Sequence, residues 1–251
     1  MLYVSFGVEK GGSTYTYILI RTALEAAGHA HVQVDLEGRP VNDDSLRSER
    51  VRRRAVNNIN VWNEDVLAAV SAAVPQEALV ALRTHGEPDP AVLEAIDSGR
   101  AYLGVGVRDP RDLALSMLDV ATQRIGLAHR PHWLRIEPGD LASALPAVQR
   151  TVDRALKWVR PGATVFYYEE TAFRPRLTLD RFCRQTGLPL FTDEAAEKIV
   201  ATASASPHGK RNVAAPLRHT REMNADDQKR VLDHFSSFYD RFFPGADVAL
   251  A

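Results

Sequence analysis

Residues 2–15 read LYVSFGVEKGGSTY, and this stretch decides the fold. The apolar run 2–7 predicts a short buried strand. Apolar residues at helical spacing over 15–27 predict a helix, and Gly28 is the residue type that ends one. The chain therefore opens with a strand, a loop and a helix in that order.

The loop between strand and helix carries Lys10, Gly11 and Gly12. Such a loop cradles phosphate, because glycines let backbone N–H groups approach an anion and the helix N-terminus adds a favourable dipole. An ordinary ATP- or GTP-binding loop needs Gly-Lys-Ser/Thr after four intervening residues. Gly7 and Gly12 have that spacing, but Ser13 stands where the lysine is required. The pattern indicates a phosphate site and argues against an ordinary ATP or GTP enzyme, although a tight turn with a solvated lysine explains this loop equally well.

Strand and helix patterns alternate along the rest of the chain. Further strands are predicted at 31–36, 78–82, 100–107 and 164–168, and helices at 49–60, 66–74, 90–98, 113–127, 139–159, 177–186, 193–200 and 225–243. This alternation predicts an α/β fold of three layers, like that of P-loop proteins, with a central parallel sheet flanked by helices. Ligands of such sheets bind beyond the carboxyl ends of the strands. With no repeat and no low-complexity linker, residues 1–251 are predicted to form a single domain.

The composition is that of a soluble globular protein, with 31 basic and 32 acidic side chains and a formal charge of -1. This balance argues against a nucleic-acid partner. The single cysteine, Cys183, excludes an internal disulfide or a multi-cysteine metal site. No apolar run is long enough for a membrane span and no leader precedes the first strand, so a cytoplasmic protein without a metal site is expected.

A second motif lies at residues 107–116, which read VRDPRDLALS. A plain strand-to-helix corner explains Pro110 in the first helical turn, Asp112 as its cap and Arg111 in solvent. That reading leaves Ser116, buried among apolar residues, unexplained.

The stretches 9–15 and 107–116 together resemble the two nucleotide motifs of the PAPS-dependent sulfotransferases, enzymes whose donor is 3′-phosphoadenosine 5′-phosphosulfate. The first family motif runs roughly Pro-Lys-Ser-Gly-Thr-Thr-Trp. The second runs Arg, Asn/Asp-Pro-Lys/Arg-Asp, with a serine eight positions after the arginine. This chain departs from the first motif at Glu9, Gly11 and Tyr15.

The resemblance implies that the chain binds PAPS and releases its 3′,5′-bisphosphate product, PAP. Arg108 and Ser116 would hold the 3′-phosphate. Weaker parallels place Tyr168 near the adenine, and Thr202, Lys210 and Arg211 near the nucleotide; a core tyrosine and a solvated basic loop remain open alternatives. The implied donor-binding residues are Lys10, Gly11, Gly12, Ser13, Thr14, Tyr15, Arg108, Ser116, Tyr168, Thr202, Lys210 and Arg211.

The run 82–85, Leu-Arg-Thr-His, resembles the family's Lys-Thr-His segment after an inner strand. By this resemblance His85 is the general base that takes a proton from an acceptor hydroxyl or amine, since histidine titrates near neutrality. Lys10 would stabilise the leaving phosphate, and Arg83 would add a second cation. The catalytic residues are therefore predicted to be Lys10, His85 and Arg83.

Two other functions remain open: a P-loop-type nucleotide kinase, and a non-catalytic nucleotide-binding protein with the same fold. Segments 39–74 and 128–138 match no family pattern and are expected to face the acceptor or form a lid. The arginines at 50 and 52–54 suit either a solvated helix face or such a lid. The acceptor, a small molecule, is not identified by the sequence, and a homo-oligomer is possible.

Overall fold

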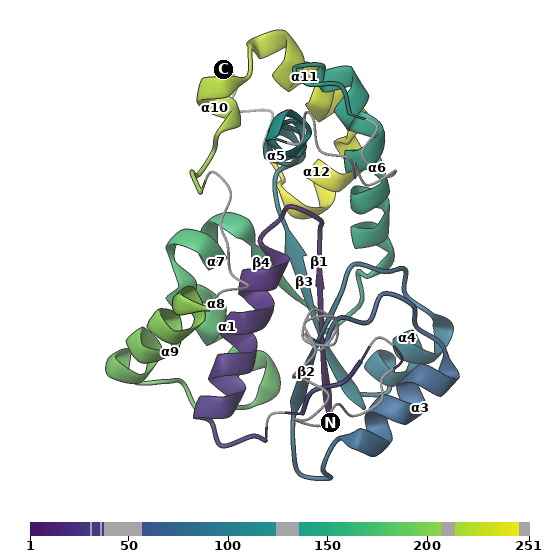
Figure 1. Cartoon of the computed structure of the whole chain (residues 1–251), viewed down its shortest axis with the longest axis vertical. Coiled ribbons are helices and arrows are strands. Elements are labelled where there is room, and N and C mark those ends of the chain that lie inside the picture. Colours follow the sequence, from purple (N-terminus) through teal and green to yellow (C-terminus); the bar gives the residue numbers. More distant parts are fainter. Residues whose placement is uncertain (31, 36, 38–56, 124–135, 207–213, 246–251) are drawn as a thin grey trace.

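The computed structural model describes residues 1–30, 32–35, 37, 57–123, 136–206 and 214–245. At its centre is a four-stranded parallel sheet in the order β2-β1-β3-β4 (Figure 1). The strands are β1 (Leu2–Gly7), β2 (Val80–Thr84), β3 (Ala101–Val107) and β4 (Thr164–Tyr167). The predicted α/β fold with a central parallel sheet is confirmed.

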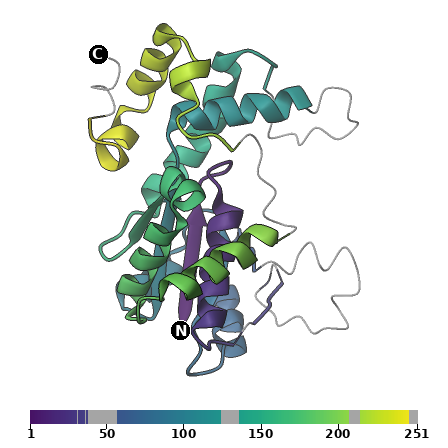
Figure 2. The ribbon, with the colours of Figure 1, turned by 90° about the vertical axis from the view of Figure 1, so that its left-hand side faces the viewer.

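Helices cover the sheet on both faces. The helices among the described residues are α1 (Ser13–Ala26), α3 (Glu64–Ala73), α4 (Pro90–Asp97), α5 (Pro110–Gln123), α6 (Leu141–Lys157), α7 (Tyr168–Phe173), α8 (Pro175–Thr186), α9 (Asp193–Ala205), α10 (His219–Glu222), α11 (Ala225–His234) and α12 (Ser236–Phe242). In Figure 1, α1, α8 and α9 lie on one face, and α3 and α4 on the other. Figures 1 and 2 both show α5 and α10–α12 gathered beyond the carboxyl ends of the strands.

The two faces of β1 enter different apolar clusters, as the alternation of side chains along a strand requires. Tyr3 packs edge-on against Phe182 of α8, with the ring centroids 5.1 Å apart. Phe6 points to the opposite face and stacks on Trp158 at 5.6 Å. Burial of each such side chain contributes about 1.5–3 kcal/mol, so both layers are fastened to the central strand.

Parallel pairing brings the ends of all four strands to one edge. Phe6 lies opposite Thr84 of β2 and Val105 of β3, and Val107 lies opposite Tyr167 of β4. The loops that follow the strands therefore meet at this edge, which is where ligands of parallel sheets bind.

Several predicted boundaries are confirmed by local backbone geometry. Asp89 caps α4 by accepting a hydrogen bond from the Ala91 N–H at 2.9 Å. Gly28 follows the end of α1 with φ 87°, and Gly187 ends α8 with φ 72°. Within the described ranges, no helix is long and apolar enough to cross a membrane.

Two predicted elements are wrong where the structure describes them. Residues 32–35 add no strand to the sheet, and residues 57–60 are not helical. The reason lies in Asn57, whose φ is 50° and whose side chain bonds the Val34 N–H at 2.9 Å and the Ala81 carbonyl at 3.0 Å. An asparagine tolerates this left-handed conformation and replaces backbone partners with its own amide, which ends a helix.

Two further boundaries differ from prediction. The helix expected over 225–243 is two helices, because the backbone turns at Phe235 with φ -111° and ψ 28°. Tyr168 was expected to end a strand but begins α7 instead.

Candidate nucleotide and catalytic site

The loop from β1 to α1 has the form of an anion cradle. Gly12 stands at the N-cap of α1 with φ 76°, and no side chain caps this helix end. A Cβ on Gly11 would lie 2.3 Å from the side chain of Val8, so only glycine fits there. The N-terminal N–H groups of α1 are thus presented at the carboxyl edge of the sheet, where they can bind an anion.

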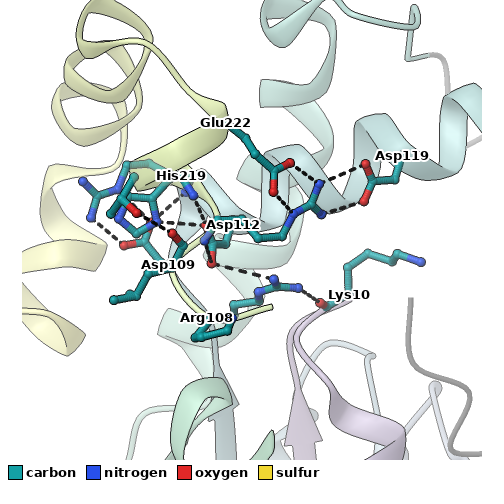
Figure 3. A network of polar contacts seen from close by, with 12 residues as sticks. Lys10, Arg108, Asp109, Asp112, Asp119, His219 and Glu222 are labelled. Carbon is teal, nitrogen blue, oxygen red and sulfur yellow. Dashed lines mark hydrogen bonds and ion pairs between the residues drawn. The ribbon is translucent and has the colours of Figure 1, made fainter. Parts of the chain in front are cut away.

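Arg108 lies directly against this loop. Its side chain is 3% exposed, and its Nη1 donates to the carbonyl of Lys10 at 3.0 Å. The ring of Tyr168 covers the guanidinium at 4.0 Å. Figure 3 shows the Lys10 carbonyl facing Arg108 while the Lys10 side chain extends away. The structure therefore brings together Lys10, Arg108 and Tyr168, which belong to three separate sequence motifs.

Part of the Arg108 guanidinium lacks a hydrogen-bond acceptor among the described residues. Its Nε and Nη2 atoms are buried and make no hydrogen bond there. The Asp112 carboxylate is near, with Oδ2 3.7 Å from Nη2, beyond hydrogen-bond length. Parallel N–H groups of one guanidinium suit a phosphate held by two hydrogen bonds.

Ser116 lies on α5 and is 3% exposed. It stands four residues after Asp112, and residues at that spacing share one face of a helix. The strand-to-helix corner between β3 and α5 differs from the interpretation in which Asp112 caps the helix and Arg111 lies in solvent. Asp109, not Asp112, accepts the Arg111 N–H at 2.8 Å at the start of α5, and Arg111 is buried against Asp109 rather than solvated.

His85 follows β2 and reaches back to the same loop. Its Nδ1 is 2.6 Å from the carbonyl of Gly7, and its Nε2 is 3.3 Å from the hydroxyl of Ser13. Because a carbonyl only accepts hydrogen bonds, Nδ1 carries the proton and Nε2 presents its lone pair. Nε2 is therefore the atom of His85 that can accept a proton.

Burial, together with the nearby cations Arg83 and Arg154, lowers the pKa of His85 to about 4 against the opposing effect of the Gly7 carbonyl. The imidazole is consequently neutral at pH 7. The expectation that His85 titrates near neutrality is therefore wrong. A bound anion would raise this pKa again.

The Arg83 side chain lies between the loop and Asn58. It donates to the hydroxyl of Thr14 and, through Nε, to Asn58 at 3.0 Å. Asn60 accepts the backbone N–H of His85 at 2.9 Å. Neither asparagine was predicted as a site residue, because both fall in the helix expected over 49–60; the run Asn-Asn-Ile-Asn, rich in turn formers, was the available signal.

A cavity of about 510 Å³ opens beside His85. Glu9, Trp62, Asp89 and Arg154 line it together with His85. Arg154 joins two sides of this cavity, with Nη1 3.3 Å from Glu9 and 3.4 Å from the His85 carbonyl. A group bound in this space would lie beside His85.

Glu169, the residue after Tyr168, has a perturbed acidity. Burial, together with the charge of Asp112, raises its pKa to about 7 against the opposing effects of its own backbone N–H and of Arg108. Its Oε1 is buried and makes no hydrogen bond with any described residue. The folded state therefore holds a proton on Glu169 that an unfolded chain releases above a pH of about 4.5.

Glu169→Gln is expected to stabilise the fold by roughly 2 kcal/mol at pH 7.5, because each pKa unit is worth about 1.4 kcal/mol and partial solvation reduces the total. Because the pKa of Glu169 is raised in the fold, the wild type loses stability as pH rises from about 4.5 through about 7. The stability gain of Glu169→Gln should therefore vanish below pH 4.5. Urea unfolding across this pH range measures it. Glu197→Gln, on the exposed face of α9, is the control. An equal gain at all pH values would contradict the account.

The remaining predicted donor-site residues are placed as follows. Tyr15 is 6% exposed, and its hydroxyl is 3.3 Å from Ser204 of α9. Thr202 is exposed on the same helix. Lys210 and Arg211 lie outside the described residues, as do Arg50 and the arginines at 52–54.

Among the described residues, no three His, Cys, Asp or Glu side chains gather as a metal site would require.

No protein-family model matches the chain, and no curated protein matches it in sequence. Solved structures do match. The crystal structure of retinol dehydratase in complex with androsterone and the inactive cofactor PAP aligns with 95% of this chain and 80% of its own, at TM-score 0.53 and 13% identity. The sulfotransferase domain from the curacin biosynthetic pathway aligns over 94% and 97%, at TM-score 0.49 and 11% identity. The first alignment shows that the chain shares the fold of retinol dehydratase.

Proposed function

We propose that the chain transfers a sulfuryl group from PAPS to a hydroxyl or amine of a small-molecule acceptor and releases PAP. The observation that carries the proposal is the buried Arg108, held against the Lys10 carbonyl with two nitrogen atoms that lack hydrogen-bond acceptors among the described residues. Arg108 brings the two phosphate motifs together, which suits a nucleotide that carries phosphate at both its 3′ and its 5′ position. The fold shared with retinol dehydratase, whose structure holds PAP, supports the same nucleotide here.

In this proposal the two phosphates bind at different elements. The 5′-phosphosulfate lies on the loop and the N-terminus of α1, where Gly11, Gly12, Ser13 and Thr14 present N–H and hydroxyl groups. The 3′-phosphate lies on Arg108. Ser116, Tyr15, Tyr168, Thr202, Lys210 and Arg211 stay predicted donor contacts, within a single predicted domain of residues 1–251.

The chemical step follows from the placement of His85. An acceptor in the adjoining cavity attacks sulfur through its oxygen or nitrogen, and the bond from sulfur to the 5′-phosphate oxygen of PAPS breaks. The acceptor proton passes to Nε2 of His85, and the electron pair leaves on the phosphate of PAP. Lys10 stabilises this charge. Arg83 contributes its own charge and orients the Thr14 hydroxyl.

Arg108→Met is expected to weaken PAP binding about 100-fold, because two charge-assisted hydrogen bonds to the 3′-phosphate are lost. ATP has no 3′-phosphate and should bind both proteins weakly and alike. Titration calorimetry with each nucleotide measures this. Arg100→Met, at the far end of β3, is the matched control, and Ser116→Ala is a milder second variant should Arg108→Met fail to fold.

The same titrations separate the competing functions. Tighter binding of ATP than of PAP by the wild-type chain would contradict the sulfotransferase and favour a kinase. Binding of PAP with no transfer of labelled sulfate from PAPS to a broad acceptor panel would favour a non-catalytic nucleotide-binding protein.

A further inference from the structure

The buried carboxylate of Asp112 links the C-terminal part of the chain to Arg108. Asp112 is fully buried on α5. Its Oδ1 accepts two hydrogen bonds at 2.8 Å from His219 of α10, one from the backbone N–H and one from Nδ1 of the ring. Its Oδ2 accepts from the Arg218 N–H at 3.3 Å and faces Arg108 at 3.7 Å.

The same segment is anchored a second time by the Arg218 side chain. This guanidinium forms ion pairs of 2.6 Å with Asp119 of α5 and with Glu222 of α10. Figure 3 shows these contacts side by side, with the chain of interactions running from Glu222 and Asp119 through Asp112 to Arg108 and Lys10. A helix of four residues is thereby docked on the element that begins just after Arg108.

Asp112 lies between Arg108 on one side and the donor groups of Arg218 and His219 on the other. Burial alone would raise the pKa of Asp112, but the hydrogen bonds from His219 and the charge of Arg108 lower it below its ordinary value, so the carboxylate is ionised. Without the His219 ring, Oδ1 would lose a donor and Asp112 would gain from closing the 3.7 Å gap to Arg108. A closed ion pair would occupy the guanidinium N–H groups that otherwise lack acceptors.

We propose that His219 is a positioning residue for the donor site: by holding Asp112 back from Arg108, it keeps the guanidinium open for the nucleotide's 3′-phosphate. The identity of this anion rests on the proposed function. His219 itself lies behind Asp112 and acts through it, so it contributes to donor affinity rather than to the chemical step.

Two substitutions of His219 test the proposal. His219→Leu fills the space without a donor and is expected to raise the Kd for PAP and the KM for PAPS about 10-fold, with kcat within a factor of two of wild type. His219→Asn places an amide N–H close to the position of Nδ1 and is expected to restore most of the affinity. Both variants retain the backbone N–H that bonds Asp112. Unchanged PAP affinity in His219→Leu would overturn the proposal.

A control separates positioning from general loss of stability. Gln185→Leu removes the hydrogen bonds that Gln185 donates to the carbonyls of Leu103 and Gly162, and is expected to lower Tm without changing PAP affinity. A PAP affinity loss in Gln185→Leu as large as in His219→Leu would overturn the assignment.

A readout that needs no nucleotide distinguishes this proposal from the proposed function. The Arg108 Nε–H resonance, assigned by its loss in Arg108→Met, should shift in His219→Leu and return in His219→Asn. If wild-type protein binds no PAP while this resonance behaves as expected, the donor assignment fails and the positioning role stands. If PAP binds and the resonance is the same in all three proteins, the positioning role fails.

Discussion

Lys10→Ala is expected to lower kcat about 1,000-fold, the cost of removing one group that stabilises transition-state charge in a water-excluded site. Affinity for PAP should fall less than 10-fold, because the contact between the loop and Arg108 uses the Lys10 carbonyl, which alanine retains. The backbone of Lys10 has φ 65°, and alanine bears the same strain as lysine there, so fold stability should change little. Rapid-quench measurement of sulfate transfer and calorimetry with PAP separate the two effects.

Two companion variants sharpen this test. Lys10→Arg keeps the charge and should retain more activity than alanine. Lys229→Ala removes an exposed lysine that pairs with Asp233 on α11, and it should leave kcat unaltered. A loss of PAP affinity with kcat unchanged in Lys10→Ala would contradict the assignment, because it would show that the lysine contributes equally to ground-state and transition-state binding.

His85→Ala is expected to lower kcat about 100- to 10,000-fold, the range that general base catalysis contributes, with PAP affinity near that of wild type. The pH profile carries a second expectation. A base must be unprotonated, and the pKa of His85 is lowered to about 4, so kcat/KM should hold as pH falls to about 5 and decline only near pH 4. As pH falls, kcat should begin to decline at a higher pH than kcat/KM does, because the bound anionic donor raises the pKa of His85.

The matched control for this substitution is His234→Ala, which alters an exposed histidine on α11. Near-normal turnover in His85→Ala would remove the base assignment. The carboxylate of Glu9, which lines the same cavity, would then become the candidate base.

Much of the fold was predictable because it depends on local patterns. Short stretches with clear apolar spacing or turn residues predicted the strand, loop and helix at residues 2–26 and the motif that begins at Arg108. They also predicted the ends of α1, α4 and α8. The errors fall at Asn57 and its neighbours, where side-chain hydrogen bonds to Val34 and Ala81 override helical spacing.

The loop around Lys10 and the motif at Arg108 were set by the sequence itself, since each is a run of residues whose types suit a phosphate. Their meeting was decided by the parallel pairing of β1 with β3, which carries the Arg108 side chain to the Lys10 carbonyl across 98 positions of sequence. The contact between Asp112 and His219, 107 positions apart, and the low pKa of His85 likewise exist only in the folded chain. Hydrogen bonds and desolvation depend on distances in space, and no local pattern encodes which distant residue will fill them.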